Sequence, residues 1–371
     1  MKKLFSAFLI LLLIISSSAI SFAEVPGAST KIAFEDIEAI MLSNSIQMAV
    51  AKNAVDKAKL DYSNSKSDIT ETQAQYDALD PQSPSYWTSS LSLSNQLKAL
   101  RSTGDSLKFA LDSAEIRYNQ QVKTFVIAAQ KQYIGILLAE GTSLINENTI
   151  ASLEKQLAAM NIRFLKGYAS QKQLTTLSNQ ISDLKLSSNS QVEQTKALNS
   201  KLRSSLGLTT TAPLLLTPLL EFDYSAIEKI VYADDLAKVL ENSITIKISQ
   251  NSLDSINKTA KNSYNPSKFR YSIKDAELAL SQTKTTAQES FQDQYNSLIS
   301  SRNDLSISNR DLETKQKDLA IAKKKLALGL ASSKSVADLA NELTSLTIKN
   351  KAAKDNLYLD YIQYENSKLG Y

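Results

Sequence analysis

The sequence lacks the residue types that most often carry out chemistry in proteins. Its 371 residues include no histidine and no cysteine. Histidine is the commonest general base, a cysteine thiolate is a common nucleophile, and the two together are the usual ligands of zinc. Only carboxylate chemistry or a serine and lysine pair stays open to an enzyme. We therefore predict that the protein is not an enzyme and has no catalytic residue, no metal site and no cofactor.

The most specific local motif is a short block around a glycine, and it occurs twice. The first glycine turn comprises Lys166, Gly167, Tyr168 and Ala169, and the second comprises Leu328, Gly329, Leu330 and Ala331. Glycine often ends a helix, and the serine that follows each block can cap the next helix. Each turn is thus either a helix cap alone or a cap that also presents a surface to a partner. The repetition of the flanking residues favours the second interpretation.

A longer repeat contains these turns. Asn44, Ser45 and Ile46 recur 198 positions later as Asn242, Ser243 and Ile244, and the two glycines lie 162 positions apart. The second copy is therefore shorter between these two landmarks. We expect a first repeat over residues 24–207, a linker with prolines over 208–224 and a second repeat over 225–371.

Long helices are the elements that this sequence favours. Glycine and proline number only 8 and 6, far below their average share of about 7% and 5%. After each glycine turn, apolar residues recur at alternating spacings of three and four, as in Leu174, Leu177 and Ile181, which is the heptad pattern of coiled coils. We predict an all-α fold of two tandem helical hairpins. The predicted helices span residues 33–79, 86–165, 170–206, 233–262, 272–328 and 332–369.

The first residues have the layout of a secretory signal peptide. Lys2 and Lys3 precede an apolar run over residues 4–15, and small residues end at Ala23. We expect export and cleavage between Ala23 and Glu24. The alternative is an uncleaved anchor, but a span needs about 20 apolar residues.

The charges argue against a nucleic-acid partner. Without the signal peptide, 40 basic residues face 38 acidic ones, because Lys2 and Lys3 are lost from the 42. A nucleic-acid-binding protein needs a clustered basic surface, whereas these charges are interleaved.

With two such units, the mature chain resembles the TolC family of outer membrane efflux proteins. The second glycine turn is close to that family's tip sequence, the first is a looser match, and Leu206 with Gly207 matches the end of a family repeat. The resemblance implies a homotrimer that forms a helical cylinder around a channel. It also implies that the two glycine turns dock on a periplasmic adaptor protein coupled to an inner-membrane pump, and that the protein is a passive conduit in the outer membrane.

Three features depart from the family. The family places proline where Ser45 and Ser243 stand. It also inserts a β-hairpin between the first two helices of each unit, as part of a membrane barrel. Here residues 262–272 leave room only for a turn, and residues 74–97 read mostly as polar turn and helix, with weak alternation only over residues 86–93. Finally, the family often has an acid six residues after the glycine, where this chain has Gln173 and Ser335. Asp338 is the nearest substitute as a channel-entrance acid.

Several other residues have both a structural and a functional interpretation. Lys323, Lys324 and Lys325 form either a solvated face or a set of partners for adaptor acids. Trp87 is either a local packing residue or an interfacial anchor, and the tyrosines either fill grooves between helices or line a path for aromatic substrates. The alternative to a duct is a structural or interaction coiled-coil protein of the cell envelope.

Overall fold

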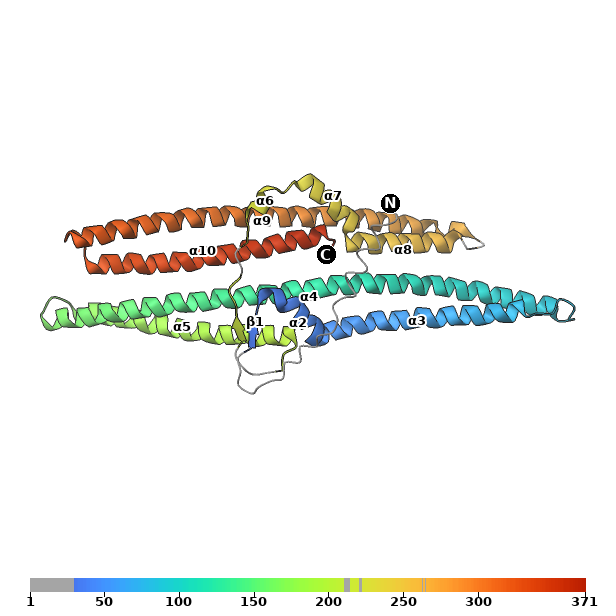
Figure 1. Ribbon diagram of the computed structural model, residues 1–371, viewed down its shortest axis with the longest axis horizontal. Coiled ribbons are helices and arrows are strands. Elements are labelled where there is room, and N and C mark those ends of the chain that lie inside the picture. The colour runs from blue at the N-terminus through green and yellow to red at the C-terminus, as the bar shows by residue number, and fades with distance from the viewer. Residues whose placement is uncertain (1–29, 210–213, 220–221, 262, 264) are drawn as a thin grey trace.

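The computed structural model describes residues 30–209, 214–219, 222–261, 263 and 265–371. The predicted signal peptide and its cleavage site lie outside these residues. Of the described residues, 87% are helical and 2% are in strands. The predicted all-α fold is confirmed (Figure 1).

Two long helices run along the molecule, each in its own layer, and the longer one spans its full length (Figure 1). These are α4 (Tyr86–Leu165) and α9 (Arg270–Ala327). At a rise of ~1.5 Å per residue, α4 is about 120 Å long and α9 about 87 Å. Each is flanked by two shorter antiparallel helices, one on each half. The flanking helices are α3 (Ile46–Asp77) and α5 (Gln171–Leu206) on α4, and α8 (Ile244–Lys261) and α10 (Ser333–Lys368) on α9.

The short elements gather near the middle of the long helices, in a region that we call the central belt (Figure 1). They are β1 (Thr30–Ile32), η1 (Phe34–Asp36), α2 (Ile37–Asn44), β2 (Leu214–Leu216), α6 (Ser225–Glu228) and α7 (Tyr232–Asn242), whereas η2 (Pro266–Phe269) lies between α8 and α9. β1 and β2 pair in parallel, with Thr30 opposite Leu214.

The hydrophobic core lies in the central belt. One cluster joins Phe34, Val126 and Leu202, and a second joins Phe291, Leu298 and Leu357. Away from the belt, burial continues at the heptad spacing: Leu97, Gly104 and Leu111 of α4 are each seven residues apart. The parts of the molecule on either side of the belt, which we call the arms, are therefore built of antiparallel helix pairs packed at heptad spacing, and the belt supplies most of the packed core.

The two layers contact each other along α4, which packs against both α8 and α10. Asp105 of α4 forms an ion pair with Lys258 of α8 at 2.6 Å. Gly141 lets α10 approach closely, because a Cβ added there would lie 2.7 Å from the side chain of Ile348.

Most predicted helix ends agree with the structure to within two residues, and residues 86–165 form α4 as predicted. The prediction of single helices over 33–79 and 233–262 was wrong. Ser45 and Ser243 leave the helical conformation, with ψ of 123° and 120°, and so separate α2 from α3 and α7 from α8. The cause is tertiary contact, because the break at Ser45 lies against Gly207 at the end of α5.

Residues 78–85, between α3 and α4, form turns and bends rather than strands. Trp87, directly after this segment, is 80% exposed and contacts the ring of Tyr86 edge to face. Local packing of Trp87 is therefore limited to this one ring contact, and its role as an interfacial anchor stays a prediction. Within the described residues, no helix combines the length and the apolar character needed to cross a membrane.

Candidate docking interface

The two glycine turns have the same backbone geometry. Gly167 and Gly329 have φ of 77° and 70°, in the left-handed region that favours glycine. In each turn the glycine N–H bonds to a carbonyl three residues back, and the next N–H bonds to one five residues back, at 2.8 to 2.9 Å. This is the Schellman motif, which satisfies the last carbonyls of a helix. The predicted turns are thus helix ends of defined shape.

A serine starts the next helix after each turn. Ser170 accepts a hydrogen bond from the backbone N–H of Gln173, and the Gln173 side chain accepts one from the backbone N–H of Ser170, which makes a capping box. Ser332 accepts a bond from the N–H of Ser335 at 3.1 Å. These caps fix both turns on two sides and favour a rigid connection.

The glycine turns present apolar side chains to solvent. Tyr168, Leu328 and Leu330 are each more than 70% exposed, and Leu165, just before the first turn, is 83% exposed. Lys166 and both glycines are exposed as well, whereas Ala169 and Ala331 are half-buried. The sequence interpretation missed Leu165, which the apolar run Ile162, Phe164 and Leu165 before the glycine could have indicated.

Both glycine turns lie at one end of the molecule, on the left of Figure 1, where α4 meets α5 and α9 meets α10. The opposite end carries the α3–α4 and α8–α9 connections. Two turns separated by 162 residues of sequence are therefore displayed together.

Asp338 lies on α10, one to two helical turns after the second glycine turn. Its carboxylate forms an ion pair with Lys334 at 2.6 Å, and its side chain is 41% exposed. Gln173 and Ser335, at the positions where the family often has an acid, take part in the helix caps instead. The role of Asp338 as a channel-entrance acid stays a prediction.

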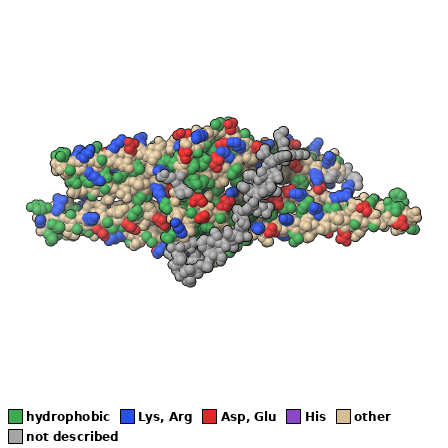
Figure 2. Space-filling model, in the orientation of Figure 1, with side chains coloured by type: hydrophobic (Ala, Val, Ile, Leu, Met, Phe, Trp, Pro, Cys, Tyr) green, Lys and Arg blue, Asp and Glu red, His purple; other side chains and the backbone are tan. Residues whose placement is uncertain are grey.

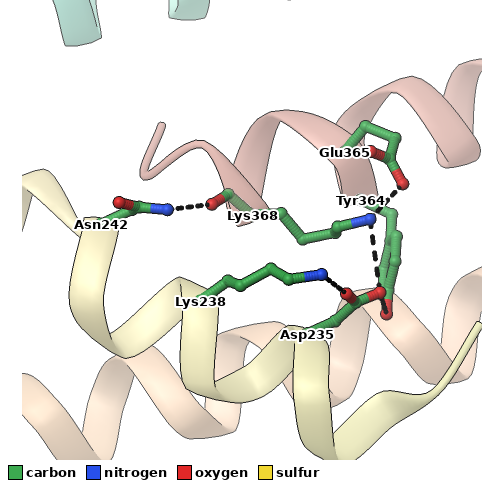
Figure 3. Close-up of polar contacts among 6 residues, drawn as sticks. All are labelled: Asp235, Lys238, Asn242, Tyr364, Glu365 and Lys368. Atoms are coloured by element: carbon green, nitrogen blue, oxygen red, sulfur yellow. Dashed lines mark hydrogen bonds and ion pairs between the residues drawn. The ribbon is translucent and has the colours of Figure 1, made fainter. Parts of the chain in front are cut away.

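A buried polar network holds the end of α10 to α7 in the central belt (Figure 3). Asp235 accepts a hydrogen bond from the Tyr364 hydroxyl at 3.0 Å and ion pairs from Lys238 at 2.9 Å and Lys368 at 3.3 Å. Asn242 donates to the carbonyl of Lys368 at 2.9 Å. The sequence analysis missed this network, because Asp235 and Tyr364 are far apart in the chain.

The network sets the charges of its members. Burial acts to raise the pKa of Asp235, but the bonds from Lys238, Tyr364 and Lys368 outweigh it and hold that pKa below its usual value. Burial and the Asp235 carboxylate both raise the pKa of Tyr364, so the hydroxyl stays protonated and donates. The group is therefore a satisfied structural contact between two helices.

A shallow pocket of about 330 Å³ opens beside this network. Its walls include Lys229, Lys238, Asp234 and Glu365, so charges of both signs line it. No group of three or more acidic residues that could hold a metal ion occurs among the described residues. We find nothing in this pocket that selects a ligand.

The comparisons with known proteins identify the fold. No protein-family model and no curated protein matches the sequence. Among solved structures, CusC, described for its folding and transmembrane channel formation, aligns with a TM-score of 0.64 and 12% identity over 95% of this chain and 96% of that chain. The CmeC outer membrane channel of Campylobacter jejuni gives 0.61 and 11% over 95% and 90%. The outer membrane protein VceC of Vibrio cholerae gives 0.61 and 9% over 91% and 96%. The chain therefore has the fold of the TolC-family outer membrane efflux channels that its duplicated helices and paired glycine turns resemble.

Proposed function

We propose that this protein is a component of an efflux or secretion duct of the cell envelope. Three copies form a helical cylinder, and the glycine turns of each copy dock on a periplasmic adaptor of a transport system. The protein is the passive conduit, and an inner-membrane pump supplies the energy.

The observation that carries this proposal is the exposure of the glycine turns. Tyr168, Leu328 and Leu330 lie on backbone turns that hydrogen bonds fix, and their side chains are solvent-exposed at one end of the fold. Fully burying a leucine side chain is worth about 1.5–3 kcal/mol. An apolar surface that folding leaves unused is available to a partner.

Exposed apolar residues along the helices support assembly side by side. Ile46, Val50 and Leu60 of α3 are 60% to 77% exposed, and their spacing places them on one helical face. Leu278 and Ile307 of α9 are about half exposed and also share a face. Neighbouring protomers would cover both stripes.

Export precedes this function. We propose that the signal peptide is removed between Ala23 and Glu24 and that residues 24–207 and 225–371 are the two copies of the duplicated unit, joined by residues 208–224. The intact mass of the protein recovered from the cell envelope tests the cleavage site.

The test of the duct is the mass of the mature protein, measured by light scattering in buffer without detergent and again in mild detergent. A trimer in either condition is expected. A monomer in both would exclude a duct that assembles by itself. That result would favour the second candidate, an envelope coiled-coil interaction protein, which the turns at residues 78–85 support because they take the place of the family's strands.

A further inference from the structure

The end of the molecule that carries the glycine turns is strongly basic. Residues 155–182 contain four basic residues and no acidic one, and residues 319–337 repeat this pattern. The eight bases are Lys155, Arg163, Lys166, Lys172, Lys323, Lys324, Lys325 and Lys334. Figure 2 shows blue side chains near this end in both layers. We call these eight side chains the basic collar.

The opposite end of the first hairpin has the reverse charge. Residues 67–97 contain Asp68, Glu71, Asp77 and Asp80 and no basic residue. The opposite end of the second hairpin is basic instead, because residues 255–274 contain Lys258, Lys261, Lys268, Arg270 and Lys274 and no acidic residue. There, however, Lys258 pairs with Asp105 and Lys274 pairs with Glu277. Charge is therefore separated along the first hairpin only.

The basic collar is available for a partner. All eight side chains are exposed, and within the part of the chain that the structure describes only Lys334 forms an ion pair, with Asp338. These exposed positive charges repel one another, and a molecule that supplies negative charge would relieve that repulsion.

The positions of the bases indicate a partner that reaches past the tips. Lys323, Lys324 and Lys325 are consecutive, and at ~100° per residue they span about 200° of the circumference of α9. Lys155 lies twelve residues before Gly167, or about 18 Å back along α4. A flat anionic bilayer that touched the turns would lie beyond the ~10 Å screening length from Lys155.

We propose that the glycine turns dock on a protein whose contact surface carries aspartate or glutamate side chains around small apolar pockets. The pockets receive Tyr168, Leu328 and Leu330, and the carboxylates pair with the basic collar. This inference rests on the proposed docking function and adds the chemistry of the partner. Charge gives the encounter its speed and orientation, while the leucines are held in the pockets.

Carbodiimide cross-linking in intact cell envelopes tests the charges directly, because this reagent joins an amine only to a carboxylate in contact with it. We expect peptides in which collar lysines are joined to aspartate or glutamate of one partner protein. The K323Q/K324Q/K325Q variant should lower the yield about fivefold or more. The matched control is K52Q/K57Q/K59Q, which removes three exposed lysines of α3 away from the tips and should leave the yield unchanged.

A photoreactive amino acid in place of Leu330 separates the two proposals. It traps a docked protein whatever the charge of that protein. If it traps a partner while no carboxylate is joined to the collar, the acidic-partner inference is wrong and the docking function stands. If neither reagent traps a protein, the docking function fails as well.

The remaining alternative is a lipid surface. Three results together would contradict the inference: the wild-type protein cosediments with vesicles of equal phosphatidylglycerol and phosphatidylcholine, the K323Q/K324Q/K325Q variant does not, and no protein cross-link forms. The inference is supported if carboxylate cross-links form and cosedimentation is either absent or the same for the variant and the wild-type protein.

Discussion

The central belt and the glycine turns use the same backbone motif in opposite surroundings. Among the described residues, positive φ occurs only at four glycines: Gly167, Gly207, Gly329 and Gly370. Each ends a helix with the same pair of hydrogen bonds. In the belt, a Cβ on Gly207 would lie 2.1 Å from the Asn44 carbonyl oxygen, and a Cβ on Gly370 would lie 2.2 Å from that of Asn242. At Gly167 and Gly329 a Cβ would meet nothing within 4 Å.

The difference separates what folding requires from what it leaves free. In the belt, glycine is needed for its φ and for the close approach of another backbone. At the turns only the φ is required, and the neighbouring leucines and lysines contact solvent. Packing therefore explains the belt residues, whereas the residues of the turns need another explanation, which the proposed docking would provide.

The Gly207→Ala substitution should have the largest effect on stability. The added methyl group would overlap backbone atoms of Asn44 and Ser45, which cannot move without displacing α2 from α5. We expect a loss of about 4 kcal/mol or more in the free energy of unfolding. Urea denaturation followed by far-UV circular dichroism measures it.

Gly135→Ala is the matched control for Gly207→Ala. Gly135 lies inside α4 with open space around it, so alanine should stabilise the helix by up to about 1 kcal/mol. Equal effects of the two substitutions would show that the belt is not tightly packed at Gly207.

The Asp235→Ala substitution tests the polar part of the belt and should rank second. It leaves the buried Tyr364 hydroxyl without its acceptor and Lys368 without one of its two acids. We expect a loss of about 3 kcal/mol in the free energy of unfolding. Asp234→Ala removes an exposed neighbouring carboxylate and should change it by less than about 0.5 kcal/mol. Similar losses in the two variants would contradict the network in Figure 3.

The same network predicts a pH dependence. The pKa of Asp235 is lower in the folded protein than its usual 3.8. Its carboxylate therefore stabilises the fold fully above that usual value, and this contribution is lost as the pH falls through the folded pKa. Between neutral and acidic pH, wild-type protein should lose more stability than Asp235→Ala does.

The Gly329→Ala substitution should have a smaller effect, because only the left-handed backbone is strained. The expected loss is about 1–2 kcal/mol, measured by the same urea titration. A loss as large as that of Gly207→Ala would mean that the second glycine turn is packed against a neighbour, and the contrast between belt and turns would be wrong.

The sequence predicts the arms better than the belt. The ends of α4 follow from Pro84 and Gly167, whose effects on the backbone are local. The breaks at Ser45 and Ser243 have no local signal as strong, because they depend on contact with glycines more than 100 residues away. The repeated Asn, Ser and Ile at both breaks, where the family has proline, was the available clue.

The candidate site also has parts that the sequence predicts and parts that it does not. Both glycine turns could be located from the sequence, because their φ is a local property. Their common position at one end, and the exposure of Leu165 and Leu330, depend on how two layers of helices align. The Asp235 network was not predictable, since Asp235 and Tyr364 are 129 residues apart and meet only when α7 packs on α10.

The smallest expected effect on stability is that of Leu330→Ser. Leu330 is 73% exposed, so the polar side chain should change the free energy of unfolding by less than about 0.5 kcal/mol. Leu298→Ala in the belt is the contrasting variant, because Leu298 is fully buried and its truncation should cost about 2–5 kcal/mol.

A functional assay should rank Leu330→Ser and Leu298→Ala in the reverse order, with the larger loss of activity per folded molecule in Leu330→Ser. If the second glycine turn docks on a partner, Leu330→Ser removes an apolar side chain from the interface while the fold stays intact. Transport activity in cells should then fall in Leu330→Ser at unchanged protein level, whereas Leu298→Ala should lose activity only in proportion to the folded protein that remains. Full activity of Leu330→Ser would mean that the exposed leucine is a feature of the surface alone, and the docking role of the second glycine turn would have to be abandoned.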